Sequence, residues 1–462
     1  MMRMSQAAQA LGVPLSGGDA QFDAVCTDSR SVKRGDLFVA LKGERYDAHA
    51  FVAQAAAAGA AGLLVQQPSD IALPQIVVDD TTNALGRLGN YWRRQFDIPL
   101  IAVTGSNGKT TVKDMLATIL RTAVNPDSED KNADAGVLAT RGNLNNHIGV
   151  PLTLLELRSA HKYAVIEMGM NHAGEISYIS RMAEPSVAVI NNAGVAHMEN
   201  LGSAEAIARA KGEVFDGLKP GGTAVINADD QFAPLWRTST ATKQLEFALD
   251  SDAAVTATYE LREFDSEIVL KTPRGSSTAV VPAPGLHNVR NALAASAAAT
   301  ALQVPVNTVA AGLARFGGTK GRLQKKSGFN GATLIDDTYN ANPDSMRAAI
   351  TVLARIPGKT LLVMGDMGEL GADAIAMHAQ IGEFARAAGI PEVFALGNLS
   401  VHAVQAFGAG ARHFARIEDL LAEIKTVLAP DVTVLVKGSR FMQMERVVKT
   451  FENAASPRAG AH

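Results

Sequence analysis

The residues best suited to chemistry lie in one short stretch, Thr104-Gly105-Ser106-Asn107-Gly108-Lys109-Thr110-Thr111. It follows an apolar run at 100–103, which predicts a buried parallel strand, and precedes apolar residues at helical spacing over 112–120. Glycines let backbone N–H groups approach phosphate oxygens, and the N-terminus of a helix adds partial positive charge. Lys109 would neutralise the outer phosphates of a nucleoside triphosphate, and the Thr110 hydroxyl would bind Mg²⁺. This stretch, here called the nucleotide loop, therefore predicts nucleotide binding, although it is shorter than the usual GxxxxGK[ST] pattern.

A carboxylate ends another predicted strand of the same sheet. The run Tyr163-Ala164-Val165-Ile166 predicts a buried strand, and Glu167 follows it directly. Ligands of open parallel sheets bind beyond the carboxyl ends of the strands, and a buried carboxylate is unfavourable unless it is paired or holds a metal. An ion pair with a lysine or arginine is the alternative, but beside the nucleotide loop the position favours a Mg²⁺ ligand.

Two asparagines and a histidine follow a third predicted strand. Asn191 and Asn192 end the strand expected at 187–190, and His197 comes soon after them. A lone histidine is more often a loop or core residue than a ligand. Because His197 leaves a strand parallel to that of Glu167, we slightly favour a metal or phosphate contact.

Other polar segments stand at strand or helix ends. The amide-rich segment 142–146 either holds phosphates and substrate carbonyls or forms an ordinary asparagine-rich turn. Lys211 lies on a helix expected from Ser203, where a solvated lysine is the default expectation. The segments 336–343 and 437–440 each follow a predicted strand, and both are expected to face the nucleotide loop across a crevice.

Strand and helix patterns alternate along most of the chain, which predicts an α/β fold. Three domains are expected: a smaller N-terminal α/β domain over 1–98, a central nucleotide-binding parallel sheet over 99–316, and a C-terminal Rossmann-like doubly wound sheet over 317–462. The polar, alternating stretch 255–281 predicts antiparallel strands added to the central domain, and the glycines of 317–321 predict a hinge. Further strands are predicted at 37–41, 62–65, 75–78, 223–226, 333–336, 360–364, 393–396 and 432–436, and helices at 51–61 and 288–302.

Composition narrows the class of protein. The 462 residues include 43 basic and 46 acidic side chains, for a net charge of −3, without a long basic run, which argues against nucleic acid as a partner. The single cysteine, Cys26, has no internal disulfide partner and fits a reducing compartment. No signal peptide and no apolar run long enough to span a membrane is present, so we expect a soluble, cytoplasmic protein.

These motifs resemble those of the ATP-dependent Mur ligases, which form amide bonds in peptidoglycan synthesis. The resemblance covers nearly the whole chain and rests on the nucleotide loop and on three further motifs, Asn191-Asn192 through His197, Lys211-Gly212-Glu213 and Asp337-Thr338-Tyr339-Asn340-Ala341-Asn342-Pro343. Within the family, the chain most resembles the members that add D-alanyl-D-alanine, through segments 26–30, 37–45, 142–146, 339–343 and 437–440. The Asp-Asn-Pro-Arg motif usual in the diaminopimelate-adding members is absent, and Arg141, Gly142 and His147 stand where relatives vary.

The resemblance implies a reaction and its partners. ATP would phosphorylate the terminal carboxylate of a UDP-N-acetylmuramoyl tripeptide, and the amine of D-alanyl-D-alanine would attack the acyl phosphate. The third residue of the tripeptide, diaminopimelate or lysine, stays open. A monomer with two Mg²⁺ ions and no nucleic-acid or membrane partner is expected.

The resemblance also implies roles for single residues. Thr110 and Glu167 would hold one Mg²⁺ and His197 a second, while Lys211 would be carbamylated and orient that second metal. The adenine, ribose and phosphates would contact the nucleotide loop together with Asn288, Asn291, Arg322, Asp337 and Tyr339. The two substrates would contact Ser29, Arg30, Asn143, Asn145, Asn146, Asn340, Lys437 and Arg440.

Two other classes of function remain open from the sequence. A folylpolyglutamate-type ligase would share the nucleotide loop and the amide chemistry. A nucleotide-binding switch would share the loop alone and would turn over ATP without needing an amine.

Overall fold

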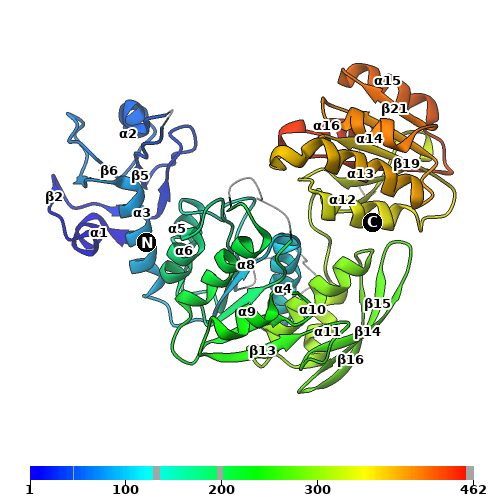
Figure 1. Cartoon of the computed structure of the whole chain (residues 1–462). Helices are drawn as coiled ribbons and strands as arrows, with labels where there is room; N and C mark the ends of the chain where they lie inside the picture. Colours follow the sequence, from blue (N-terminus) through cyan, green and yellow to red (C-terminus); the bar gives the residue numbers. More distant parts are fainter. Residues whose placement is uncertain (45, 128–135, 195–200, 454–462) are drawn as a thin grey trace, which may run out of the picture.

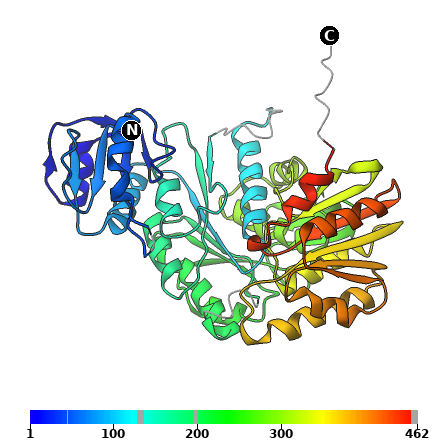
Figure 2. The ribbon, with the colours of Figure 1, turned by 90° about the horizontal axis from the view of Figure 1, so that it is seen from above.

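The computed structural model describes residues 1–44, 46–127, 136–194 and 201–453. Three α/β domains follow one another along the chain, and the N-terminal and C-terminal domains lie on opposite sides of the central one (Figure 1, Figure 2). The predicted three-domain α/β architecture is confirmed. In the described part of the chain, no helix is both long and apolar enough to cross a membrane.

A six-stranded parallel sheet, in the order β13-β12-β11-β8-β10-β9, forms the centre of the molecule. Its strands are β8 (Leu100–Thr104), β9 (Val137–Ala139), β10 (Tyr163–Glu167), β11 (Val187–Ile190), β12 (Thr223–Asn227) and β13 (Lys243–Phe247). Glu167 pairs in register with Val103, and Ile190 with Thr104, so three strands end side by side. The nucleotide loop therefore emerges between Glu167 and Asn191.

Helices cover both faces of this sheet, which explains why its strands are almost entirely apolar. The first face carries α4 (Lys109–Val124), α10 (Leu286–Ala301) and α11 (Val306–Ala314). The second carries α5 (Gly149–Leu154), α6 (Glu175–Ala183), α8 (Ala204–Gly212), η2 (Glu213–Gly217) and α9 (Ala233–Thr238). The predicted antiparallel strands are β14 (Thr256–Leu261), β15 (Ser266–Thr272) and β16 (Gly275–Val281), which form a sheet of their own and bury Ile268 and Val281 in the first core.

The C-terminal domain is a second doubly wound sheet, in the order β17-β18-β22-β19-β20-β21. Its strands are β17 (Gln324–Ser327), β18 (Thr333–Asp337), β19 (Lys359–Gly365), β20 (Glu392–Leu396), β21 (Ala411–Phe414) and β22 (Val432–Lys437), of which β17 is antiparallel. One face packs against α12 (Pro343–Leu353), α13 (Ala374–Ala387) and α14 (Ser400–Phe407), and the other against α15 (Ile417–Val427) and α16 (Glu445–Phe451). Asn342 caps α12, since its side chain accepts from the Ser345 N–H at 2.9 Å.

The N-terminal domain has a small mixed sheet, in the order β2-β7-β6-β5-β4. Its elements are α1 (Met4–Leu11), β2 (Leu15–Ser16), β4 (Ala24–Cys26), β5 (Asp36–Val39), α2 (Val52–Ala57), β6 (Gly62–Val65), β7 (Gln75–Val77) and α3 (Thr81–Arg93), with a separate pair β1 (Met2–Arg3) and β3 (Gln21–Phe22). Every strand predicted above is present, with ends within two residues of the prediction. The helix predicted at 51–61 is wrong in length: it ends at Ala57, because Gly59 takes a φ of +95°.

The last turn of α3 fixes the N-terminal domain to the central one. Arg93 is 1% exposed, and its guanidinium donates to three backbone carbonyls, those of Ala183 at 3.0 Å, Phe96 at 2.6 Å and Ile98 at 3.1 Å. One turn earlier, a Cβ added to Gly89 would lie only 2.8 Å from Pro151 Cβ. The backbone of α3 at Gly89 therefore packs directly against Pro151 of the central domain, with no room for a side chain. The two domains share one continuous packed interface.

The neighbouring arginines Arg93 and Arg94 provide a matched test of this interface. Arg93→Met should lower stability by about 3 kcal/mol or more, because three carbonyls lose a charged donor. Arg94→Met should change stability by less than about 1 kcal/mol, since Arg94 is exposed and its ion pair with Glu184 lies at the surface. Calorimetric unfolding checks both variants, and equal shifts in midpoint would contradict the assignment of Arg93.

Candidate functional site

The nucleotide loop turns sharply at the carboxyl end of β8 and leads into α4. Gly108 has a φ of +80°, and a Cβ there would lie 2.2 Å from Asn291 Oδ1, so only glycine fits. Lys109 folds back over the loop, and its Nζ donates to the Gly105 carbonyl at 2.6 Å. Burial lowers the pKa of Lys109, and the Glu167 carboxylate opposes that shift. The loop thus holds an enclosed amine where the outer phosphates of a nucleotide are expected.

Asparagine side chains fix the shape of the loop without adding charge. Asn191 Nδ2 donates to the Asn107 carbonyl and to Asn291 Oδ1, both at 2.9 Å. Asn192 donates to the same carbonyl at 3.0 Å and accepts from the Asn107 N–H at 2.9 Å. Asn291 in turn donates to Asn288 Oδ1 at 3.1 Å. Two strand-end asparagines and two helix asparagines therefore act as one network, which connects the predicted nucleotide contacts of α10 to the loop.

The nucleotide loop lies between two cavities. Cavity 1 has a volume of 810 Å³ and cavity 2 a volume of 640 Å³, and Asn107, Gly108 and Arg322 line both. Among the other predicted residues, cavity 1 is lined by Thr111, Asn288, Asn291, Asp337 and Lys437. Cavity 2 is lined by Ser106, Lys109, Thr110, Asn143, Asn145, Asn146, Glu167, Tyr339, Asn340 and Arg440. A ligand that bridges the loop would reach both cavities.

Glu167 has the features of a metal ligand. It is 2% exposed, and its Oε1 accepts from Asn145 Nδ2 at 2.7 Å. Its Oε2 is buried and has no hydrogen-bond donor within the described ranges. Such an oxygen is costly to bury unless a cation completes its coordination, and Thr110 offers a hydroxyl in the same cavity. These groups fit a Mg²⁺ ion whose remaining ligands are phosphate oxygens.

Lys211 is not the solvated lysine expected by default. It lies in the last turn of α8, as predicted, but is only 2% exposed. Burial lowers its pKa well below the usual value, and the nearby Lys109 acts in the same direction. Among the residues that the structure describes, none makes a hydrogen bond or ion pair with its amine. Both effects favour the neutral, nucleophilic form of the amine over the ammonium.

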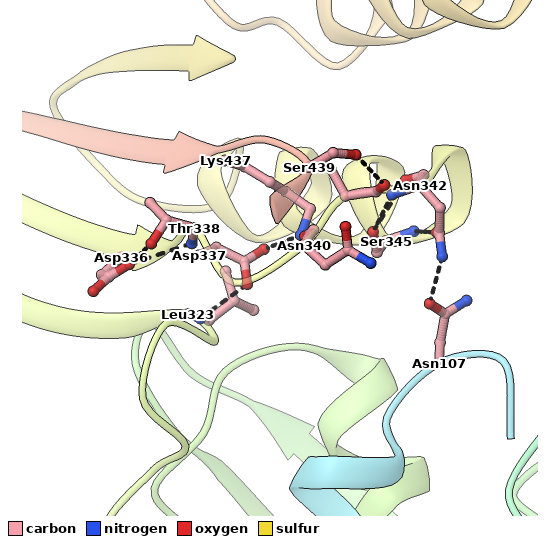
Figure 3. Close-up of polar contacts among 11 residues, drawn as sticks. Asn107, Leu323, Asp336, Asp337, Thr338, Asn340, Asn342, Ser345, Lys437 and Ser439 are labelled. Carbon is pink, nitrogen blue, oxygen red and sulfur yellow. Dashed lines mark hydrogen bonds and ion pairs between the residues drawn. The ribbon is translucent and has the colours of Figure 1, made fainter. Parts of the chain in front are cut away.

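The C-terminal domain meets the nucleotide loop directly (Figure 3). Asn342 Nδ2 donates to Asn107 Oδ1 at 2.8 Å. Within the C-terminal domain, the Arg322 guanidinium stacks over the Tyr339 ring at 4.5 Å. Tyr339 therefore faces cavity 2, whereas Asp337, its predicted partner at the ribose, faces cavity 1.

The predicted pair of Lys437 and Arg440 is divided between the two cavities. Lys437 is 2% exposed, and its Nζ lies 2.7 Å from Asp337 Oδ2 and donates to the Asn340 carbonyl at 2.9 Å (Figure 3). Arg440 is exposed and lines cavity 2. The structure does not bring Lys437 to the face that carries Arg440.

Some predicted residues lie apart from the two cavities or outside the described structure. Thr104 and Gly105 form the base of the loop and line neither cavity. Ser29 and Arg30 belong to the N-terminal domain, where Ser29 donates to Gln54 at 3.2 Å and Arg30 pairs with Asp28 at 2.7 Å. His197 lies outside the described residues.

Several cavity residues were not predicted from the sequence. In cavity 1, Asp229 and Asp230 follow β12, so the strand-end rule would have found them. His287, in the first turn of α10, has its pKa lowered to about 4 by burial and then by Lys437 and Arg290. In cavity 2, Glu369 and Phe441 stand on turns that follow β19 and β22, positions that the same rule covers.

Three family models match the chain in order along its length. They are "Mur ligase family, catalytic domain" at residues 21–104, "Mur ligase middle domain" at 103–299, and "Mur ligase, glutamate ligase domain" at 321–440. The chain is 43% identical to UDP-N-acetylmuramoyl-tripeptide--D-alanyl-D-alanine ligase of Escherichia coli (strain K12), over 97% of the chain and 98% of that protein. It is 38% identical to the ligase of the same name from Bacillus subtilis (strain 168), over 92% of both chains.

Solved structures agree with these family matches. MurF from Acinetobacter baumannii superimposes with a TM-score of 0.88 at 39% identity, covering 96% of this chain and 97% of that one. MurF ligase from Thermotoga maritima in complex with ADP gives a TM-score of 0.79 at 26% identity, covering 92% and 96%. A mutant of L. casei FPGS, at 19% identity and a TM-score of 0.58, covers 80% of this chain and 94% of its own and shares the fold alone.

Removing the amine of Lys109 tests the nucleotide loop. Lys109→Ala should lower the rate of ATP turnover about 100-fold or more, because a preorganised cation beside the transferred phosphoryl group is lost. Release of ADP is the measurement, and Lys162→Ala, an exposed lysine just before β10, is the control. A folded Lys109→Ala protein with near-normal ADP release would contradict the assignment.

Proposed function

The chain belongs to the Mur ligase family, and we propose that it joins D-alanyl-D-alanine to a UDP-N-acetylmuramoyl tripeptide while ATP is converted to ADP and phosphate. The observation that carries the proposal is identity of 43% over nearly the full length of a relative with that name. The geometry supports it, because a nucleotide loop between two cavities suits one ligand that delivers a phosphoryl group and another that receives it.

The reaction has two steps, both of which depend on positioning. The terminal carboxylate of the tripeptide attacks the γ-phosphorus of ATP, and the bond to ADP breaks. The amine of the dipeptide then attacks the carbonyl carbon of the acyl phosphate, phosphate leaves, and the amine loses a proton. A carboxylate alone is a poor electrophile, so phosphorylation supplies the leaving group, and the protein holds the reacting atoms together.

Each part of this chemistry has residues suited to it. Lys109 and the loop amides hold the phosphates. Adenosine lies in cavity 1, which is lined by Asn288, Asn291, Arg322 and Asp337. Tyr339 stacks on Arg322 from the side of cavity 2. One Mg²⁺ would be held by Thr110 and Glu167 and a second by His197, and these ions would neutralise phosphate charge during transfer. The donor peptide meets Asn143, Asn145, Asn146 and Asn340, and the uridine diphosphate meets Ser29 and Arg30.

The domains divide this work. We assign the sugar-nucleotide to residues 1–98, ATP to 99–316 and the amino acceptor to 317–462. The matched family ranges 21–104, 103–299 and 321–440 support these boundaries. Lys437 is assigned with Arg440 to the acceptor side, although its amine is paired with Asp337. A monomeric, cytoplasmic enzyme fits dependence on ATP and the single thiol of Cys26.

Lys211 is proposed to carry a carbamate. Its neutral amine would attack CO₂ and lose a proton, which replaces a cation by an anion able to orient a metal. The burial of Lys211 and its lowered pKa support this step, and an uncompensated ammonium there would face Lys109.

The identity of the acceptor tests the proposed function. Product formation and ADP release should depend on D-alanyl-D-alanine, and neither diaminopimelate nor lysine should replace it. Arg440→Ala should raise the KM for the dipeptide about tenfold or more and leave the KM for ATP unchanged, whereas Arg416→Ala, an exposed arginine that lines neither cavity, should change neither. Efficient ligation of diaminopimelate or lysine would refute the function, and ADP release without an amine would indicate a switch.

Chemical rescue tests the carbamate. Lys211→Ala should be almost inactive, and a short-chain carboxylic acid in the assay should restore part of the rate, because it supplies the missing anion. Lys211→Arg should also be inactive, since a guanidinium does not form a stable carbamate. Full activity of Lys211→Arg, or absence of rescue by any short-chain acid, would rule out the carbamate.

A further inference from the structure

A buried ion pair lies in the second turn of α4, close to the nucleotide loop. Its members, Lys113 and Asp114, stand one helical turn after Lys109 and Thr110. Lys113 Nζ lies 2.7 Å from Asp114 Oδ1, and Lys113 is only 5% exposed. Successive residues of a helix do not face each other, so a pair between them is not an ordinary helix contact. Contacts outside α4 must therefore help to hold these two side chains together.

Lys113 bonds to the strand end that carries Glu167. Its Nζ donates to the carbonyl of Thr140, a buried residue that continues β9, at 2.8 Å. The Thr140 N–H donates to the Val165 carbonyl of β10 at 3.0 Å, and Thr140 Oγ1 accepts from the Glu167 N–H at 2.9 Å. Two hydrogen bonds thus lead from the ammonium of Lys113 to the backbone of Glu167. The position of the expected metal ligand depends on this connection.

Asp114 bonds to the segment between the central and C-terminal domains, residues 317–321, here called the linker. Its Oδ2 accepts from Thr319 Oγ1 at 2.7 Å, and Thr319 is buried. The Thr319 carbonyl accepts from the Arg322 N–H at 3.1 Å, which closes a turn. Arg322 in turn lines both cavities. The Thr319 hydroxyl therefore connects α4 to the turn that places Arg322.

These contacts join into one chain of partners, here called the coupling network: Thr319, Asp114, Lys113, Thr140 and Glu167. The two oxygens of the Asp114 carboxylate accept from different partners, and an ammonium has donors enough for both contacts of Lys113. Loss of one member leaves a buried charge or carbonyl unpaired, so the contacts depend on one another. An ion pair that served folding alone would instead leave metal binding unaffected.

We infer that Lys113 and Asp114 are positioning residues that couple the metal ligand Glu167 to the linker at Thr319. The inference rests on the proposed function, which assigns Mg²⁺ to Glu167. While Thr319 bonds to Asp114, the ammonium of Lys113 is held, and the strand end with Glu167 keeps the position that suits a metal. Linkage acts in both directions, so metal binding favours the linker conformation in which Thr319 contacts α4.

The experiment measures metal binding rather than turnover. Mn²⁺ replaces Mg²⁺, and free Mn²⁺ is read from its electron paramagnetic resonance signal with the full chain and saturating ADP. Thr319→Val removes the linker hydroxyl at nearly constant volume, so the dissociation constant of Mn²⁺ should rise about fivefold, as expected for one hydrogen bond. Thr319→Ser keeps the hydroxyl and should bind as the unmodified chain does. Thr118→Val is the matched control, because the Thr118 hydroxyl donates to the Asp114 carbonyl within α4, and it should also leave Mn²⁺ binding unchanged.

A double variant tests the coupling. Lys113→Met keeps the apolar stem but removes the ammonium, so the dissociation constant of Mn²⁺ should rise about tenfold or more. Adding Thr319→Val to Lys113→Met should cause no further rise, because the coupling network is already broken. Thermal midpoints report folding, and if Lys113→Met does not fold, Thr140→Val takes its place in the double variant with the same expected result.

An unchanged Mn²⁺ dissociation constant in Thr319→Val, an equal rise in Thr118→Val, or additive rises in the double variant would overturn the inference. If the unmodified chain with ADP binds no more Mn²⁺ than ADP alone, the metal site of the proposed function fails, and the inference fails with it. The unmodified chain thus distinguishes the two failures.

Discussion

The site depends on burying three ionisable side chains, wholly or in part, around the nucleotide loop. Lys211 and Glu167 are each 2% exposed, Lys109 is half-buried, and the pKa of each lysine is lowered chiefly by desolvation. Burying a charge without a partner costs several kcal/mol, so the arrangement is favourable only when phosphates and a cation complete it. The fold supplies the rigidity that this requires, because β8, β10 and β11 end side by side and are covered on both faces. Ligand binding and the electrostatics of these side chains are thereby coupled.

Neutral amides connect this charged centre to the rest of the molecule. Asn191, Asn192 and Asn291 hold the loop, and Asn107 extends the network to Asn342 at the start of α12. An amide donates and accepts without introducing a further charge, which would have to be desolvated as well. The same asparagine that shapes the loop therefore contacts the C-terminal domain, and a ligand that moves Asn107 also changes its contact with Asn342.

The sequence predicted the architecture and the nucleotide loop because both follow from local pattern: buried parallel strands are apolar runs, and polar residues at their ends mark the site. It missed the edge strands of all three larger sheets (β9 and β13, β17 and β21, β2 and β4) and the pair β1 and β3, since these strands are short or polar and carry no long apolar run. The burial of Lys211 depends on packing between α8 and its neighbours, which no local pattern records. The separation of Lys437 from Arg440 arises because Lys437 is the last residue of β22, while Arg440 follows a turn that faces the other cavity.

The two interfaces of the central domain differ in kind, and the difference bears on motion. On the N-terminal side, Leu85 and Leu88 of α3 share a core with Leu155, and Arg93 bonds to backbone carbonyls. On the C-terminal side, the cross-domain contacts include Asn342 to Asn107, Thr319 to Asp114 at 2.7 Å, Lys325 over the Phe264 ring, and Val352 of α12 beside Gly285; the hydrogen bonds among them join side chains. The segment that connects the central and C-terminal domains contains Gly317 and Gly318. A Cβ added to either glycine would have no neighbour within 4 Å, so the space around this segment is open. An apolar core with backbone bonds resists rotation, whereas side-chain contacts exchange readily, so we expect the C-terminal domain to move and the N-terminal domain to stay fixed. This asymmetry suits the order of the proposed chemistry, because the C-terminal domain, to which we assign the amino acceptor, then approaches a donor that is already held.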